Sequence, residues 1–318
     1  MRIGLFISDV SGEQTTIDEL LANARAAEAL GFSTGWVPHI PWSLDGLTAL
    51  ALAGQVTDRI ELGTAVMPTY PRHPLAMAQQ AMSTQAATDG RLVLGIGPSH
   101  PVVIESMHGL EYARPAHHTR EYVEVLRAAF AGAGHVEYRG ECFAFSSMLT
   151  VPGSTPAPIM IAALAPKMLQ LAGELTDGTI TYWANERAVG EHIVPRITAA
   201  ADAAERPAPR VVVGLPVAVC SDPDAGRERA QKLFATYLNI PTYQRILARG
   251  GDDTSPADVA IIGTEAEVTQ RLRSYAAAGA TDLCATALGL DDDRDASQRR
   301  TIELLASLTP DLQEVEHA

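Results

Sequence analysis

The chain has 318 residues, with 24 lysines and arginines against 38 aspartates and glutamates, so its net charge is −14 at pH 7 with histidine neutral. This acidic balance argues against a nucleic-acid-binding protein, because phosphate neutralisation needs a basic face. A composition of 47% hydrophobic and 19% charged residues is globular and excludes a disordered chain. The length is ordinary for an α/β barrel with insertions.

The first residues form an apolar run, Met1–Ser8, that is too short for a signal peptide or a membrane span. We interpret it as the first buried strand of a protein that we expect to be cytoplasmic and without a membrane partner. The three cysteines are isolated and make no CxxC pair, so no zinc knuckle or redox motif is indicated.

Short apolar runs then alternate with segments of helical periodicity along the chain. Most of the runs are apolar on both faces, which is typical of buried parallel strands. The expected strands are Arg2–Ser8, Thr34–Val37, Ile60–Val66, Leu92–Gly97, Ile159–Ala163, Gly178–Trp183, Val211–Cys220 and Asp282–Thr286. Between them, Thr16 with Glu19 and Thr264 with Glu267 predict capping boxes at helix starts, and Pro166 suits a first helical turn.

About eight βα units predict an α/β fold, a TIM (β/α)8 barrel, with a doubly wound open sheet as the alternative. We expect one domain over residues 1–318, with insertions at the carboxyl-end face at about 98–156 and 239–262. The first insertion contains a helix-like segment, Arg120–Phe130, and a hairpin-like segment, His135–Phe145. Long insertions after barrel strands usually shape a substrate pocket.

Several common motifs are missing. Gly95-Ile96-Gly97 lacks the third glycine of a dinucleotide-binding fingerprint, and no phosphate-binding GxxxxGK[ST] loop or GxSxG elbow exists. His108, His117 and His118 have no partners at metal-ligand spacing, so we expect surface histidines and no metal site.

The informative segments lie where strands turn into loops, which is the active-site face of a barrel. They are Trp36–Trp42, Gly63–Pro74, Gly90–Gly97, Pro158–Lys167 and Asp177–Trp183. Together they resemble the luciferase-like flavin-dependent oxidoreductases, and within them the branch that uses the deazaflavin coenzyme F-420. The resemblance runs from Met1 to about Leu308, and Gly279–Leu283 is similar to the last barrel unit of the family.

The resemblance implies a TIM barrel with its flavin at the carboxyl face, and a homodimer. It places a non-prolyl cis peptide at Ala65-Val66, where a bulge would back the central ring of the cofactor, with Trp36 and Met67 among the cofactor-binding residues. His39 matches the histidine beside the ring, and a histidine can hold or donate a proton while a hydride moves. The alternative is a loop histidine that only packs beside tryptophan.

The family's phosphate-binding turn falls at residues 162–167 of this chain, where backbone N–H groups at a helix N-terminus suit an anion. The residues implied are Ala162, Ala163, Leu164, Ala165 and Lys167. Leu164-Ala165 stands where relatives often carry two glycines, and Pro38 and Pro98 stand where they often carry acids. The residues expected to line the substrate pocket are Trp42, Tyr70, Ser99, His100 and Trp183.

The function implied is hydride transfer between coenzyme F-420 and a small organic substrate, with the protein supplying orientation and a proton. Two alternatives stay open. One is an FMN-dependent luciferase-like monooxygenase, and the other is a barrel that binds a flavin or another ligand without turnover.

Overall fold

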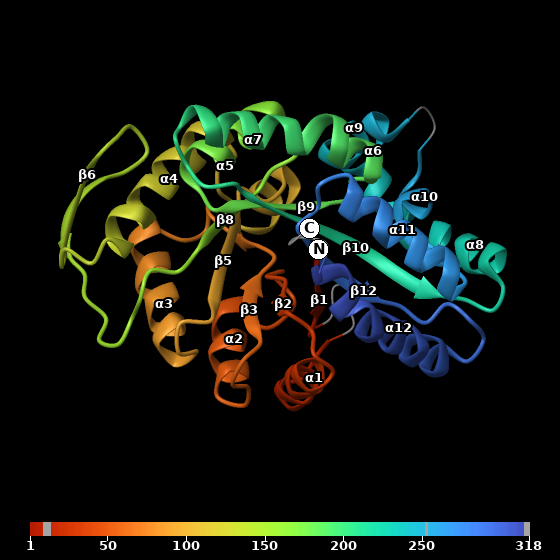
Figure 1. Ribbon diagram of the computed structural model, residues 1–318. Coiled ribbons are helices and arrows are strands. Elements are labelled where there is room, and N and C mark those ends of the chain that lie inside the picture. The colour runs from red at the N-terminus through yellow and green to blue at the C-terminus, as the bar shows by residue number, and fades with distance from the viewer. Residues whose placement is uncertain (9–13, 252–253, 315–318) are drawn as a thin grey trace.

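In the computed structural model, residues 1–8, 14–251 and 254–314 are described, so residues 9–13, residues 252 and 253 of the second insertion and the last four residues lie outside the described part. Eight parallel strands form a closed ring surrounded by helices (Figure 1). The strands are β1 Arg2–Phe6, β2 Thr34–Val37, β3 Glu61–Thr64, β5 Leu92–Gly97, β8 Ile159–Ala162, β9 Gly178–Tyr182, β10 Arg210–Val219 and β12 Asp282–Ala287. The ring closes because β10 pairs with both β9 and β12, and this confirms the predicted TIM barrel.

Two short strands extend the ring. β4 (Met67–Pro68) pairs with β5, and β11 (Ile261–Gly263) pairs with β10. The predicted strand over residues 60–66 is observed as the shorter β3, and β4 begins just after the predicted range. The sequence analysis placed residues 261–262 in an insertion because a three-residue strand is too short to show a periodicity.

The helices begin where the local signals predicted. Thr16 and Thr264 both make complete capping boxes, and Pro166 opens its helix. The longer helices are α1 Ile17–Ala29, α2 Gly46–Gly54, α3 Pro74–Ala87, α4 Pro115–Phe130, α5 Pro166–Leu175, α7 Val194–Ala203, α8 Pro223–Phe234, α9 Pro241–Gly250, α11 Glu265–Ala277 and α12 Arg294–Glu314. The short ones are η1 Val102–Met107, α6 Glu186–Ala188, η2 Val189–Ile193, η3 Ala235–Asn239 and α10 Pro256–Val259. No helix in the described ranges is both long and apolar enough to cross a membrane.

The interior of the barrel is packed with side chains. Its buried cluster comprises Trp36, Val93, Met160, Ile180, Val212 and Cys284. The indole of Trp36 covers two glycines, since a Cβ atom on Gly63 would lie 2.3 Å from the ring and one on Gly4 would lie 2.7 Å from its Nε1. The barrel is therefore a core and not a channel, and a ligand can be bound only at one of its ends.

Four charged side chains close the amino end of the ring. Asp282 pairs with Arg2 at 2.5 Å and with Arg210 at 2.7 Å. Glu61 pairs with Arg210 at 2.8 Å and with Arg2 at 3.2 Å. Because each residue stands at the start of a strand, this set seals the amino end and leaves the carboxyl end for a ligand.

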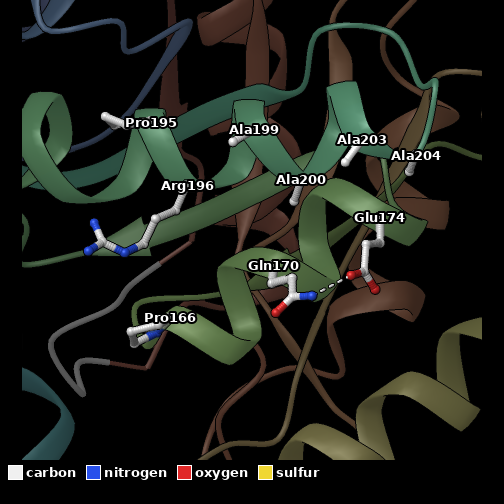
Figure 2. A pocket seen from close by; sticks show the side chains of 9 residues that line it. All are labelled: Pro166, Gln170, Glu174, Pro195, Arg196, Ala199, Ala200, Ala203 and Ala204. Carbon is white, nitrogen blue, oxygen red and sulfur yellow. Dashed lines mark hydrogen bonds between the residues drawn. The ribbon is translucent and has the colours of Figure 1, made fainter.

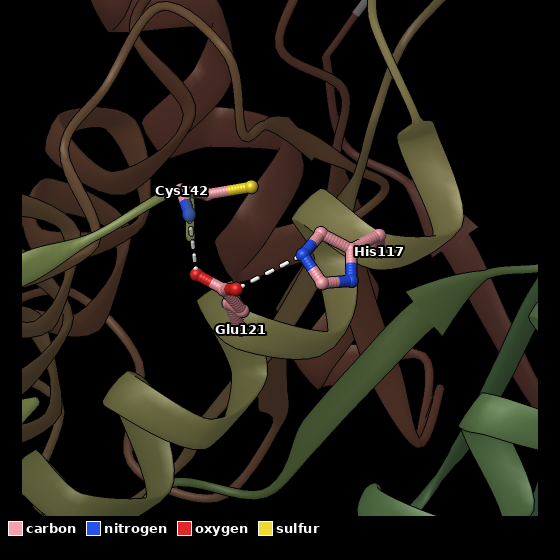
Figure 3. Close-up of side chains that lie close together, drawn as sticks. All are labelled: His117, Glu121 and Cys142. Carbon is pink, nitrogen blue, oxygen red and sulfur yellow. Dashed lines mark hydrogen bonds and ion pairs between the residues drawn. The ribbon is translucent and has the colours of Figure 1, made fainter. Parts of the chain in front are cut away.

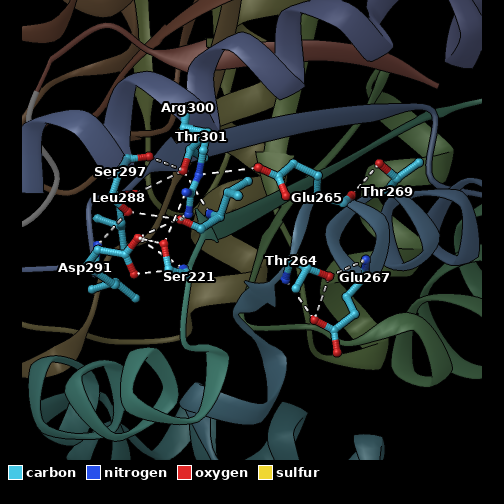
Figure 4. A network of polar contacts seen from close by, with 12 residues as sticks. Ser221, Thr264, Glu265, Glu267, Thr269, Leu288, Asp291, Ser297, Arg300 and Thr301 are labelled. Carbon is cyan, nitrogen blue, oxygen red and sulfur yellow. Dashed lines mark hydrogen bonds and ion pairs between the residues drawn. The ribbon is translucent and has the colours of Figure 1, made fainter. Parts of the chain in front are cut away.

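The long C-terminal helix is bound to the carboxyl half of the barrel by polar contacts, shown in Figure 4 together with the Thr264 capping box. Thr301 Oγ1 accepts from Val219 N–H at 2.9 Å, and the guanidinium of Arg300 donates to Val219 O at 3.2 Å and to Asp291 at 3.1 Å. α12 thus packs on β10, which is also the strand that closes the ring.

The two insertions contain the predicted elements. In the first, η1 and α4 are followed by β6 (His135–Arg139) and β7 (Ala144–Met148), which pair antiparallel as the hairpin-like pattern indicated. The second follows α8 and contains η3, α9 and α10.

Candidate active site

The carboxyl ends of β3, β5 and β8 converge closely. The Ala65-Val66 peptide bond is cis, as the family resemblance predicted, and both residues are partly buried. A Cβ atom on Gly97 would lie 2.9 Å from Ala162 Cβ and 3.0 Å from Val66 Cγ2, so the missing side chain lets these strand ends approach each other. Met67 is fully buried, so it supports this region from below.

His39 follows β2 at the same face, with 21% of its side chain exposed. Its Nδ1 accepts a hydrogen bond from Gly46 N–H at 3.2 Å, and Asp45 Oδ2 lies 3.5 Å from the same nitrogen. Burial lowers the pKa of His39, the carboxylate of Asp45 acts in the opposite direction, and the positive charges of Arg72 and His108 lower it further. The imidazole is therefore neutral at pH 7.

Asp45 is the N-cap of α2 and is held by several donors. Its Oδ1 accepts from Thr48 N–H and from Gln80 Nε2, each at 3.0 Å, and its Oδ2 accepts from Arg72 Nη2 at 2.8 Å. Burial opposes ionisation of this carboxyl, but the hydrogen bonds from Thr48 and Arg72 outweigh it and lower the pKa of Asp45 to about 2. The sequence analysis missed Asp45 and Arg72. The only available signal was the N-cap position of Asp45, which says nothing about His39.

The N-terminus of α5 is suited to an anion. Its N-cap, Ala165, offers no side-chain hydrogen bond, and Lys167 in the first turn is exposed. Arg196 from α7 lines the same surface groove of about 870 Å³ as Pro166, and Figure 2 shows both at one end of this groove. His192 Nε2 donates to Leu164 O at 2.8 Å, which fixes the turn before the helix. Pro166 has no N–H and the amides of Met168 and Leu169 donate to Ala165 O at 3.0 Å each, so Lys167 supplies the remaining amide of the first turn. This amide and the two cations are suited to an anionic group.

The aromatic side of the site combines the β4–α3 loop with the first insertion. Tyr70 stacks on His118 with ring centroids 4.0 Å apart, and its hydroxyl donates to Ala113 O at 2.5 Å. The Tyr112 hydroxyl donates to Ser99 O at 3.2 Å, so the insertion is bound to the end of β5. These contacts place Tyr70 and Ser99 at the carboxyl face, as predicted.

The remaining predicted pocket residues differ in exposure. Trp42 is 51% exposed, and partly buried His100 lies edge-on to Tyr243 of α9 at 5.3 Å. The prediction that Trp183 lines the substrate pocket is corrected, because its side chain has no exposed surface. It packs among Tyr182, Phe234 and Tyr237, which cover it. Trp36, predicted to bind the cofactor, lies in the barrel interior with no exposed surface, so it supports the site from below.

The prediction that His117 and His118 are surface residues without partners is also corrected. His118 is buried, and His117 Nε2 lies 3.0 Å from Glu121 Oε1 (Figure 3). Cys142 joins this group, and the ligand-type atoms of all three side chains lie within 4.8 Å of one another. Glu121 also accepts the backbone N–H groups of residues 141, 142 and 143 at 2.8, 2.8 and 3.1 Å. These contacts fill its acceptor positions, so the carboxylate fastens the β6–β7 turn to α4.

The fold is that of a TIM-barrel enzyme, with a partly exposed histidine and an uncapped helix N-terminus at its carboxyl face. The chain belongs to the luciferase-like monooxygenase family, whose model matches residues 1–282. The predicted family is thereby confirmed.

The chain is similar to two relatives whose names indicate oxidoreductases, and one of these names includes a cofactor. It is 32% identical over 178 residues to a protein of Mycobacterium tuberculosis named as a coenzyme F-420-dependent oxidoreductase, a match that spans 52% of this chain and 51% of the relative. It is 29% identical over 241 residues to the 5,10-methylenetetrahydromethanopterin reductase of Methanolobus tindarius, covering 76% and 72% of the two chains.

Solved structures show the same fold. An F-420-dependent secondary alcohol dehydrogenase, bound to an F-420–acetone adduct, aligns with a TM-score of 0.80 at 20% identity over 98% of both chains. The monooxygenase RslO1 of Streptomyces bottropensis aligns with a TM-score of 0.78 at 19% identity over 98% of this chain and 99% of that one. A dehydrogenase and a monooxygenase therefore share this architecture.

Proposed function

We propose that this protein is an oxidoreductase that transfers a hydride between coenzyme F-420 and a small organic substrate. The observation that carries the proposal is that a neutral, partly exposed histidine and an uncapped, cation-flanked helix N-terminus lie on the same face of the barrel. The first feature suits proton handling, and the second suits a cofactor phosphate. The relative named as an F-420-dependent oxidoreductase supports the choice of cofactor.

The residues present at the carboxyl face fit this cofactor. The first turn of α5, with Lys167 and Arg196, would hold the phosphate, because Ala165 offers no side-chain cap and Lys167 supplies both an amide and a positive charge there. Ala65 and Val66, which are only partly buried, would contact the ring. When bound, the deazaflavin supplies or accepts the hydride.

In this mechanism His39 handles the proton that accompanies the hydride. Its Nδ1 is held by the chain, so Nε2 is the nitrogen available to a substrate. Tyr70, Ser99, His100 and exposed Trp42 would form the substrate pocket, in which apolar walls exclude water while a few polar groups orient the substrate. We also propose a homodimer, which light scattering of the purified protein would test.

Titration of the purified protein with each cofactor tests the proposed function. We expect absorbance and fluorescence changes showing tight binding of coenzyme F-420 and little uptake of FMN, followed by oxidation of the reduced cofactor when a substrate panel is added. FMN-dependent oxygen consumption would instead establish the monooxygenase alternative. Binding without any redox change on the whole panel would establish a non-catalytic flavin-binding barrel.

Lys167→Ala should weaken coenzyme F-420 binding by about two- to fivefold at low salt, because one cation at a helix N-terminal anion site contributes about 0.3–1 kcal/mol. The effect should shrink at high salt, since exposed charges are screened. Dissociation constants from fluorescence titration at two ionic strengths provide the measurement. The control is Lys232→Ala, which removes the same charge from α8. Equal affinities of the wild type and Lys167→Ala at low salt would exclude Lys167 from the site.

A further inference from the structure

In the tautomer that the hydrogen bond from Gly46 N–H favours, Nε2 of His39 cannot accept a proton from a substrate. Because Nδ1 accepts the Gly46 N–H, it carries no proton, and the single proton of the neutral ring is on Nε2. Within the described residues, Nε2 has no protein hydrogen-bond partner. To accept a proton at Nε2, or to donate one without becoming an imidazolate, the ring must first carry a proton on Nδ1.

One carboxylate stands where it can stabilise a proton on Nδ1. Asp45 Oδ2 lies 3.5 Å from that nitrogen, and Asp45 is ionised over the whole physiological range. Its backbone position is fixed because it caps α2, and residue 46, the competing donor to Nδ1, follows it directly. A small rotation of the imidazole therefore exchanges the Gly46 amide for the Asp45 carboxylate.

We propose that Asp45 is the positioning residue that holds a proton on Nδ1 of His39 and thereby makes Nε2 competent to exchange a proton with the substrate. The proposal rests on the proposed function of His39. When the substrate is oxidised, its O–H or N–H proton passes to Nε2 as the hydride leaves, and the imidazolium keeps its Nδ1–H on Asp45. In the reverse direction Nε2 returns that proton to the substrate.

Arg72 weakens the interaction between the Asp45 carboxylate and Nδ1 of His39. Its Nη2 donates to the same Oδ2 atom that faces His39, so it competes with the imidazole for the carboxylate. Its positive charge also opposes an imidazolium, as does the electrostatic effect of His108. Asp45, Arg72 and His108 are the charged or titratable groups that act on His39 in the described structure. The first favours the protonated ring, and the other two favour the neutral ring.

The test is a histidine-labelled NMR titration of the protein without cofactor, in which His39→Gln identifies the signals of His39. Asp45→Asn removes the charge but keeps an efficient N-cap on α2. We expect the titration midpoint of His39 to fall by about one pH unit, because an opposite charge at this distance shifts a pKa by about that amount or more. Arg72→Gln should move the midpoint upward. Gln80→Ala, which removes a neutral contact to the same carboxylate, should leave it unchanged.

An unchanged midpoint in Asp45→Asn, or a midpoint that moves the same way in Asp45→Asn and Arg72→Gln, would overturn the proposal. Single-turnover kinetics give the second readout: hydride transfer in Asp45→Asn should slow by about tenfold or more while the dissociation constant of coenzyme F-420 stays the same. Hydride transfer as fast as in the wild type would also overturn it. A shifted midpoint in a protein that binds no coenzyme F-420 would show that Asp45 positions His39 and that the proposed function is wrong.

Discussion

Replacing His39 with alanine should slow hydride transfer on the order of 10²-fold while leaving coenzyme F-420 binding nearly unchanged. General acid–base catalysis by a positioned side chain contributes about that factor or more. The proton is needed only in the transition state, so its loss lowers the rate of the chemical step and not the affinity. Stopped-flow single-turnover kinetics with saturating cofactor measure the first quantity, and fluorescence titration measures the second.

The control for this variant is His135→Ala, because His135 lies in the exposed β6–β7 hairpin.

The dependence of the rate on pH gives a second check, because substrate reduction and substrate oxidation should change in opposite directions. The pKa of His39 is lowered from its usual value of 6.5, so substrate reduction, which needs the imidazolium, should lose rate as the pH rises through that lowered pKa. Substrate oxidation, which needs the neutral ring, should gain rate over the same interval. Wild-type single-turnover rates in His39→Ala would refute the catalytic role.

Replacing Asp282 with alanine should destabilise the protein by about 3–5 kcal/mol, because it leaves Arg2 and Arg210 without their nearest carboxylate at the amino end of the barrel. The Asp282 side chain is only 3% exposed, so its two ion pairs are shielded from solvent far more than a surface pair is. Urea unfolding followed by circular dichroism measures the free energy of unfolding.

Asp292→Ala is the matched control for Asp282→Ala. It removes an ion pair of similar length, 2.5 Å to Arg229, but the carboxylate is 96% exposed. Exposed pairs contribute about 0–1 kcal/mol, so this variant should unfold close to the wild type. Equal destabilisation by the two substitutions would show that the four-charge set at the amino end does not hold the strands together.

Much of the architecture follows from local patterns. Runs that are apolar on both faces can be satisfied only by strands covered on both sides, and eight of them alternating with helices indicate a closed barrel. Thr16 and Thr264 mark helix starts because a capping box satisfies amides within the same few residues. The cis bond at Ala65-Val66 was predicted from the family resemblance of its flanking residues, and the structure has it at that position.

The composition of the site depended on contacts between segments far apart in the sequence. Asp45 and Arg72 show no motif with His39. Asp45 lies beside His39, and Arg72 pairs with Asp45, because the loops after β2 and β4 share one end of the barrel. Trp183 resembles a pocket wall in the sequence, but Phe234 and Tyr237 cover it.

The sequence by itself determined the eight strands of the ring, the helix starts at Thr16, Pro166 and Thr264, and the family, because hydrogen bonding and periodicity act over a few residues. Only the tertiary structure decided which side chains are exposed at the carboxyl face and which charges act on His39. Burial and electrostatic energy depend on distances in space, and in a barrel those distances are set by how the ring closes.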